Sequence, residues 1–371
     1  MNVGLALLTL FPGRVGGAET YVRGLLAAYA AGDGPPLTTV LASRVSEPSL
    51  TQFVGPRIDV ATVSSYRPGN SKPTRLIAME AARLRKSTIA REVPLGLDLI
   101  HYPVTVPIPD LEGMPKVVTL LDVQHRDLPQ MFSRAEIAFR RWAYDRAAVK
   151  ADHIITNTNF SASRIVHHLG VNRDKIHVIH LGIDHHRFTA HGQGSTLPHV
   201  PGRYVYYPAN GWPHKNHDRL LEAFDRVNDP LLHLVLTGHT LDSKALRKRH
   251  PRVVHLGHVA EDQIAPLYRG AEALIFPSLY EGFGFPPLEA MACGCPVAAS
   301  DTGAAAEVCG DAALLFDPEN VTSIADAISR ISTDEPLRAS LRERGLSQAA
   351  NFTWEQSARG HDAVYQIAVA R

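Results

Sequence analysis

Short apolar runs of strand length alternate along this chain with segments in which apolar residues recur at helical spacing. Residues 3–9 form such an apolar run, and helical spacing follows over residues 16–31. Because the alternation continues through the first half, we expect a parallel β-sheet with helices packed on it, an α/β fold. Further strands are predicted at 38–42, 59–63, 98–102, 116–121, 154–156 and 176–179, and helices at 74–91, 134–150 and 161–169.

The alternation is interrupted once and then starts again. Residues 184–202 contain histidine, glycine and proline without clear periodicity, and a strand pattern resumes at 204–207. Since 371 residues exceed what one hydrophobic core usually supports, we predict a first domain over 1–183, a linker over 184–202 and a second domain over 203–353. Its strands are predicted at 231–236, 253–256 and 273–276, and its helices at 216–227, 261–268, 288–292 and after 320. A last helix is predicted over 354–369, beyond the end of this domain.

The composition is that of a globular protein. Hydrophobic residues make up 45% and charged residues 20%, and the net charge is +1, so nothing global indicates a nucleic acid partner. No apolar run approaches the roughly twenty residues of a membrane-spanning helix, and the N-terminus lacks the pattern of a signal peptide. We therefore expect a cytoplasmic protein that binds no nucleic acid.

The cysteines and histidines form no recognisable metal site. Cys293, Cys295 and Cys309 are too few and too clustered for a disulfide framework, which fits a reducing compartment. Zinc would need about four ligands at suitable spacing, and the 19 histidines show no ligand pairing. No metal is predicted.

Two carboxylates eight positions apart flank a glycine-rich turn, with the sequence Glu281-Gly-Phe-Gly-Phe-Pro-Pro-Leu-Glu289. The turn follows the apolar run at 273–276 and leads into good helix formers, so Glu281 is placed on the loop and Glu289 in the first helical turn. A helix start favours an anionic ligand, and the two carboxylates can accept hydrogen bonds from different hydroxyls of one polyol. The alternative is that Glu289 only complements the helix dipole and Glu281 is a solvated loop acid. Pro286 and Pro287 have no N–H, which leaves Gly284, Phe285 and Leu288 as nearby backbone donors.

Lys215 precedes a second amphipathic segment, in which Asn216 is expected as the N-cap. A cation at that helix start suits the diphosphate leaving group of a sugar nucleotide, whose negative charge grows during the reaction. A lone lysine is more often a surface residue.

Two further motifs follow strand-like runs in the first half. Consecutive glycines at Gly16 and Gly17 let the backbone approach a ligand closely, although glycines are more often only turn residues. The loop lacks the Gly-x-Gly-x-x-Gly pattern, so a nicotinamide dinucleotide site is not favoured. His125 is expected at the carboxyl edge of the sheet, where open α/β folds bind ligands, and the alternative is a simple loop histidine. Asp122 is expected to orient that imidazole or to cap a turn.

Together these motifs resemble the retaining glycosyltransferases of family 4. The likeness rests on residues 281–300 and extends to the Gly16–Gly17 loop, to 178–184 and to 307–311. It implies the GT-B fold, in which two Rossmann-like domains face each other across a deep cleft and the C-terminal helix, here residues 354–371, returns to the first domain.

The resemblance also implies roles for individual residues. Glu281 would contact the transferred sugar with help from the Phe283 and Gly284 amides, Lys215 the diphosphate and His125 the sugar, and these three side chains are the candidate catalytic residues. Many relatives carry an arginine six positions before the lysine, where this chain has Ala209, so Asn210 or His214 is expected to replace that phosphate contact. Glu289 would bind the ribose hydroxyls. The full set expected to bind the donor is Gly16, Gly17, Asn210, Lys215, Phe283, Gly284, Phe285, Leu288 and Glu289.

The activity implied by the family is transfer of a hexose from a nucleoside diphosphate sugar to a hydroxyl acceptor with retention, without a metal cofactor. The motifs around Trp212 and Asp122 look most like bacterial mannosyltransferase-type members, which favours GDP-mannose over UDP-hexoses. The acceptor stays open between a glycan, a lipid-linked sugar and a natural product. The alternatives are a UDP-glucosyl or N-acetylglucosaminyl transferase, a GT-B epimerase or phosphorylase, and an inactive binding subunit.

Basic and apolar residues share two predicted helices in the first domain, which suggests peripheral contact with the anionic inner face of a membrane. A solvated basic face is the commoner alternative. The basic residues are Arg75, Arg83, Arg85, Lys86 and Arg91 in one helix, and Arg134, Arg140, Arg141, Arg146 and Lys150 in the other.

Overall fold

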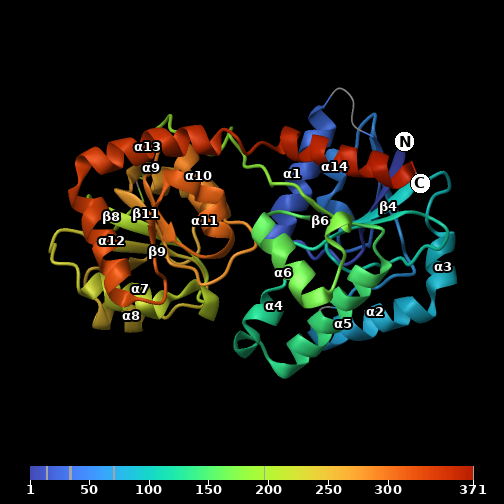
Figure 1. Ribbon diagram of the computed structural model, residues 1–371, viewed down its shortest axis with the longest axis horizontal. Coiled ribbons are helices and arrows are strands. Elements are labelled where there is room, and N and C mark those ends of the chain that lie inside the picture. Colours follow the sequence, from blue (N-terminus) through green and yellow to red (C-terminus); the bar gives the residue numbers. More distant parts are fainter. Residues whose placement is uncertain (14–15, 33–35, 70–71, 196, 371) are drawn as a thin grey trace. The chain divides into compact units, whose positions relative to one another are not determined.

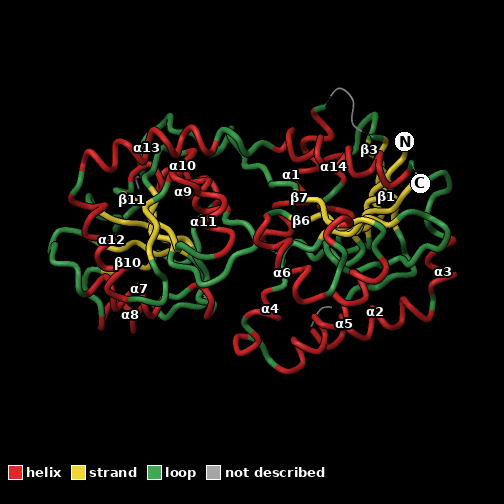
Figure 2. Tube along the Cα trace, viewed as in Figure 1, coloured by secondary structure: helices red, strands yellow, loops and turns green. Residues whose placement is uncertain are grey.

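The computed structural model describes residues 1–13, 16–32, 36–69, 72–195 and 197–370. The chain divides into two compact units (Figure 1), of which unit 1 comprises Met1–Gly182 with Trp354–Arg371 and unit 2 comprises Ile183–Thr353. Each unit has a central sheet with helices packed around it (Figure 2). The predicted α/β class is confirmed.

The sheet of unit 1 has seven parallel strands in the order β3-β2-β1-β4-β5-β6-β7. The strand order reverses between β1 and β4, and a doubly wound sheet binds its ligands beside such a reversal. Most positions of these strands are buried, as expected for a parallel sheet covered on both faces. The strands are β1 (Asn2–Leu7), β2 (Leu37–Ala42), β3 (Ile58–Thr62), β4 (Leu99–Tyr102), β5 (Lys116–Thr119), β6 (His153–Thr156) and β7 (Ile176–Val178).

Helices of unit 1 follow the predicted segments, apart from one break and the short helix α4, which was not predicted. The helix expected over 74–91 is two helices, because the backbone of Arg85 leaves the helical region (φ −102°, ψ 22°). No glycine or proline marks this break, so the sequence carried no signal for it. The helices are α1 (Gly17–Ala31), α2 (Lys72–Leu84), α3 (Lys86–Arg91), α4 (Gln124–Asp127), α5 (Arg134–Lys150), α6 (Asn159–Leu169) and α14 (Trp354–Val369).

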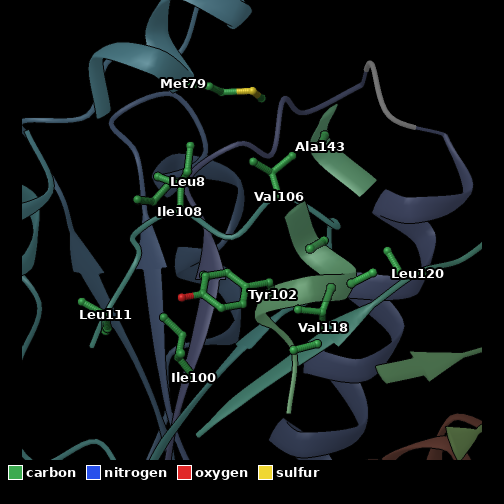
Figure 3. Packing of buried hydrophobic residues seen from close by; sticks show 14 of the residues in the cluster. Leu8, Met79, Ile100, Tyr102, Val106, Ile108, Leu111, Val118, Leu120 and Ala143 are labelled. Atoms are coloured by element: carbon green, nitrogen blue, oxygen red, sulfur yellow. The ribbon is translucent and has the colours of Figure 1, made fainter. Parts of the chain in front are cut away.

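One core cluster of unit 1 lies between the sheet and helices α2, α3, α5 and α6. Tyr102 and Val118 of the strands meet Met79 of α2 and Ala143 of α5 in one buried cluster (Figure 3). Aliphatic side chains of the loop after β4, such as Ile108, complete the cluster. The helices therefore bury apolar positions of the predicted spacing, although Ile77 and Leu84 of α2 are exposed.

Helix α14 belongs to unit 1 and packs beside α1 (Figure 1). The two helices approach so closely that a methyl group placed on Gly24 would lie 2.1 Å from the Trp354 ring. The predicted return of the C-terminal helix to the first domain is confirmed.

The sheet of unit 2 has six parallel strands in the order β10-β9-β8-β11-β12-β13. Its order reverses between β8 and β11. The strands are β8 (Tyr204–Pro208), β9 (His233–Thr237), β10 (Val253–His255), β11 (Ala273–Phe276), β12 (Val297–Ser300) and β13 (Leu314–Phe316). The helices are α7 (His217–Asp225), α8 (Ser243–Arg249), α9 (Glu261–Gly270), α10 (Phe285–Ala292), α11 (Gly303–Cys309), α12 (Val321–Thr333) and α13 (Glu335–Ala349).

Residues 184–202, expected as a linker, are counted with unit 2 apart from residue 196, which lies outside the described residues. Arg269 of α9 donates to the carbonyls of Gln193 and Thr189, at 2.9 and 3.2 Å. At the start of the segment, the Ile183 amide donates to the Phe352 carbonyl at 3.1 Å, which joins the two ends of unit 2. None of the helices within the described ranges is long and apolar enough to cross a membrane.

Candidate functional site

Lys215 and Glu281 meet where the strand order of unit 2 reverses. Lys215 ends a short 3₁₀ turn (Pro213–Lys215) in the loop after β8, and Glu281 lies in the loop after β11. The Leu279 amide donates to the His214 carbonyl at 2.8 Å, and the Tyr207 hydroxyl donates to the Lys215 carbonyl at 2.8 Å. The first bond joins the two loops at the carboxyl edge of the sheet, and the second ties the Lys215 loop to β8.

The two side chains form an ion pair with 2.6 Å between Lys215 Nζ and Glu281 Oε1. Lys215 is 13% and Glu281 15% exposed, so the pair is largely shielded from water. An ammonium group has three N–H donors, and the bond to Glu281 uses one of them. The arrangement offers a fixed cation to an anionic ligand and a fixed carboxylate to a ligand hydroxyl.

Asn216 occupies the N-cap position of α7 but does not cap it with its side chain. Its backbone is left-handed (φ 61°), and its Nδ2 donates to the carbonyls of Pro277 and Pro318, at 3.0 and 2.7 Å. The predicted N-cap position is confirmed, but the side chain does not cap the helix, because its Oδ1 accepts from Arg219 Nη1 at 3.1 Å instead of from a backbone amide. Asn216 thereby ties the loop that carries Lys215 to the end of β11.

Helix α10 begins at Phe285, three residues earlier than predicted, so Glu289 lies in the second turn and not in the first. Pro286 and Pro287 are accommodated in the first turn because the N–H groups there have no partner within the helix. Gly284 precedes the helix with φ 114°, a conformation that favours glycine. Leu288 is the fourth residue of the helix and is fully buried.

Glu289 is half-buried and accepts a hydrogen bond from the Tyr268 hydroxyl of α9, with 3.1 Å between the two oxygens. Burial raises the pKa of the Glu289 carboxyl to about 7, while the Tyr268 hydroxyl and the charge of Arg187 lower it and the charge of Glu261 raises it. Glu289 therefore exchanges its proton near neutral pH. The sequence did not reveal Tyr268, because its position beside Glu289 depends on how α9 packs on α10.

Phe283 and Asn210 line the same carboxyl edge in different ways. Phe283 is buried and packs edge-on against Phe285 and Phe352, with ring centroids 5.3 and 5.9 Å apart. Asn210 Oδ1 accepts from the His239 amide at 2.7 Å. Among the described residues its Nδ2 has no partner, which leaves a donor beside Ala209.

Two glycines open α1 in unit 1. Gly16 stands at the N-cap position with φ 52°, and Gly17 is the first helical residue. The Gly13 amide donates to Glu19 Oε2 at 2.7 Å, which ties the loop to the helix start. Arg14 and Val15 of this loop lie outside the described residues.

His125 lies on α4, which follows β5, and its side chain is fully buried. Its ring stands edge-on to Tyr144, with centroids 4.8 Å apart, and within the described ranges neither ring nitrogen has a hydrogen-bond partner. Burial, together with the charge of Arg140, lowers the pKa of His125 to about 3, so the imidazole is neutral.

The short helix that carries His125 is anchored on both sides. Asp127 accepts from Arg164 Nε at 2.9 Å and lies 2.8 Å from His168 Nε2, both on α6. Arg126 pairs with Asp145 of α5. The structure thus fixes the position of His125 within unit 1.

Comparison with known proteins decides the family. Residues 15–187 match the model described as Glycosyltransferase Family 4, and residues 197–348 match the model described as Glycosyl transferases group 1. O-antigen chain mannosyltransferase B of Escherichia coli is 30% identical over 260 residues, which cover 64% of this chain and 67% of that enzyme. The chain belongs to the family 4 glycosyltransferases.

A second relative is named for the same sugar. MMP alpha-(1->4)-mannosyltransferase of Mycolicibacterium hassiacum is 31% identical over 248 residues, which cover 62% of this glycosyltransferase and 59% of the relative. The match therefore spans less than two thirds of that relative.

Solved structures support the fold. Sucrose-phosphate synthase from Thermosynechococcus elongatus aligns with a TM-score of 0.78 at 19% identity, covering 100% of this chain and 99% of that one. The Anabaena protein HepE, solved with UDP and glucose, aligns with a TM-score of 0.70 at 19% identity and 99% coverage of both chains. The predicted GT-B class, with two Rossmann-like units, is confirmed.

Proposed function

We propose that this glycosyltransferase transfers a hexose, preferentially mannose, from a nucleoside diphosphate sugar to a hydroxyl acceptor with retention of configuration. The observation that carries the proposal is the shielded Lys215–Glu281 pair at the point where the strand order of unit 2 reverses. A diphosphate needs a fixed cation, and a hexose needs a fixed acceptor for its hydroxyls. One loop pair provides both.

In this proposal Lys215 neutralises the departing diphosphate, and the start of α10 adds the Gly284 and Phe285 amides. Glu281 accepts from the transferred sugar and Glu289 from the ribose. The Asn210 amide takes the phosphate contact that the missing arginine makes in relatives. No protein nucleophile is assigned, because the leaving phosphate takes the acceptor proton on the same face.

For unit 1 we propose the roles that the family implies. In this proposal His125, whose neutral ring is fully buried in this structure, contacts the transferred sugar only after a local rearrangement that exposes the ring, and Gly16 and Gly17 contact the donor phosphates. Since Lys215 supplies the positive charge, we propose that the reaction needs no metal. Dialysis against EDTA should leave the rate unchanged, and a loss of rate restored by magnesium would contradict this.

The choice of mannose is supported by the names of the two relatives. A UDP-hexose donor is the competing assignment, and the UDP and glucose bound to HepE support it. An epimerase, a phosphorylase and an inactive binding subunit have no such support.

Proton NMR of the reaction with GDP-mannose, and in parallel with UDP-glucose, tests donor and stereochemistry together. We expect release of GDP with the α-anomer of the sugar formed first, in the slow hydrolysis that occurs without acceptor. Initial formation of the β-anomer would contradict retention. Turnover of UDP-glucose alone would contradict the mannosyl assignment, and dependence on free phosphate would indicate a phosphorylase.

We also propose peripheral contact with an anionic membrane through α2. Ile77 and Leu84, seven positions apart on this helix, are 67% and 77% exposed, and Arg83 and Arg85 flank Leu84. An exposed apolar strip among cations suits the headgroup region of an anionic bilayer. In a density gradient, vesicles with anionic lipid should float together with the wild type. A smaller fraction of the Ile77→Glu/Leu84→Glu variant should float with them. Equal behaviour of both, or a wild type that stays at the bottom, would contradict the proposal.

A further inference from the structure

Tyr268 holds one oxygen of Glu289 in place. Its hydroxyl donates to Glu289 Oε2 at 3.1 Å, across the contact between α9 and α10. Tyr268 is fully buried, with its ring edge-on to Tyr206 at 5.3 Å and to Phe188 at 6.2 Å between centroids. The phenol is therefore fixed by packing, and it fixes the carboxylate in turn.

The second oxygen, Glu289 Oε1, has no hydrogen-bond partner in the part of the chain that the structure describes. Glu289 is only half-buried, so a ligand can reach this oxygen. We propose that Tyr268 is a positioning residue for donor binding, which orients Glu289 so that its second oxygen accepts from the ribose hydroxyls of the nucleotide sugar. This inference rests on the proposed function.

Besides orienting Glu289, the Tyr268 hydroxyl affects the pKa of this carboxyl group. Tyr268 and Glu261 face the carboxylate from α9, Tyr206 from β8, Cys293 from the C-cap of α10 and Arg187 from the segment before β8. Burial favours the protonated acid, whereas the Tyr268 hydroxyl and Arg187 favour the carboxylate. Without the hydroxyl, the Glu289 pKa rises further and less of the carboxylate remains at neutral pH.

The affinity for nucleotide sugar depends on pH because the ionised form of Glu289 is the one that binds. Only the carboxylate accepts two hydroxyl donors, so the affinity for nucleotide sugar falls as the pH falls through the Glu289 pKa. With a pKa of about 7, the wild type should bind about tenfold more weakly at pH 6 than at pH 8. Tyr268→Phe should shift this profile toward higher pH.

Calorimetric titration with GDP-mannose, and in parallel with UDP-glucose, between pH 6.0 and 8.5 tests the inference. Their diphosphates are fully esterified, so the ligand phosphates do not titrate in this range. At pH 7 we expect Tyr268→Phe to bind at least about fivefold more weakly than the wild type, with the difference shrinking toward pH 8.5. Tyr204→Phe is the matched control, because this buried hydroxyl donates to the Leu267 carbonyl of the same helix at 2.8 Å and does not touch Glu289.

Equal weakening of Tyr268→Phe at every pH, or no weakening, would overturn the inference. A wild type that binds neither nucleotide sugar would instead overturn the proposed function. If Tyr268→Phe does not fold, the same titration with Glu289→Gln tests the inference. The affinity of this variant for the nucleotide sugar should be low and independent of pH. A Glu289→Gln variant that keeps the wild-type pH profile would also overturn the inference.

Discussion

Lys215 and Glu281 are separate candidates in the sequence and one ion pair in the structure. They are 66 positions apart, and their contact requires that β8 and β11 be neighbours in the sheet. The residue types and their positions at loop and helix starts were predictable from spacing. Their pairing was not, because strand order in a sheet is set by the packing of the whole unit.

Replacing Lys215 tests the role of the pair. Lys215→Ala should lower the rate of nucleotide release from the donor about a hundredfold, since a fixed charge on the leaving group is worth about 3 kcal/mol of transition-state stabilisation. Lys248→Ala changes an exposed lysine of unit 2 and should leave the rate unchanged. Steady-state kinetics with GDP-mannose measures both, and wild-type turnover in Lys215→Ala would contradict the assigned role.

His125 is buried and neutral, which the sequence did not reveal because burial depends on how α5 covers α4. Since burial lowers its pKa to about 3, the imidazole should stay uncharged from pH 5 to pH 9 and act only through hydrogen bonds. Two-dimensional nitrogen NMR of labelled histidine, with His125→Gln for assignment, should show no titration of this ring over that range. A midpoint near 6.5 would contradict its burial.

At the scale of elements, the periodicity predicted regular helices and strands well and their ends less well. The bounds of α5, which carries a Ser133–Glu136 capping box, were predicted correctly, as were those of β11. Helix α10 was placed three residues late because two prolines were taken as loop residues. Strands β12 and β13 were not predicted. They have four and three residues, and an apolar run this short can be read as strand or helix.

Buried polar side chains fix α14 on unit 1, and their proton positions can be derived. His361 Nδ1 lies 2.7 Å from the Ser357 carbonyl, which only accepts, so this nitrogen carries the proton of the neutral ring. His361 Nε2 must then accept from the Tyr21 hydroxyl at 2.7 Å. The chain continues through Thr119 to His101, whose Nδ1 accepts from Tyr365 at 2.7 Å. The sequence did not predict this network, because its residues are far apart along the chain.

The contact of Gly24 with Trp354 tests the docking of α14. Gly24→Ala should lower the melting temperature, because a methyl group 2.1 Å from the indole ring forces a shift that typically costs about 1–3 kcal/mol. In the double variant with Trp354→Ala the added methyl should cost little, so the two effects should not be additive. Denaturant unfolding of the four proteins measures this, and additive losses would contradict direct contact.

At the scale of the molecule, the candidate residues of each unit lie beside the point where its strand order reverses, except for His125, which follows β5. The loop after β1 carries Gly16, and the loops after β8 and β11 carry Lys215 and Glu281. The alternation in the sequence predicted two α/β domains and a returning helix. It did not predict that Thr189 and Gln193 of the expected linker bond to α9, because Arg269, which donates to their carbonyls, is distant in sequence.

Four of the buried histidines in the part of the chain that the structure describes have a lowered pKa, which makes stability depend on pH. Burial lowers the pKa of His125 to about 3 and of His217 and His361 to about 4, and it lowers the pKa of His101 as well. The unfolded chain binds these protons below about pH 6.5, so each histidine costs about 1.4 kcal/mol of stability per pH unit below that value. Glu289, whose folded pKa is raised, acts in the opposite direction, but it is one group against four.

The melting temperature should therefore fall between pH 7 and pH 5. Differential scanning calorimetry across this range measures it, and His217→Gln should flatten the slope if the variant remains folded. A melting temperature that rises on acidification would contradict the buried, neutral state of these histidines.

The central claim is that unit 2 binds a nucleoside diphosphate sugar through Lys215, Glu281 and Glu289. Thermal unfolding with GDP, GDP-mannose, UDP and UDP-glucose tests it most directly, because a ligand that binds only the native state raises the melting temperature. We predict the largest rise with GDP and GDP-mannose, and a much smaller one in Lys215→Ala. A rise with UDP compounds alone would contradict the GDP-mannose assignment but support the binding site. No rise with any nucleotide, or an equal rise in Lys215→Ala, would contradict the claim.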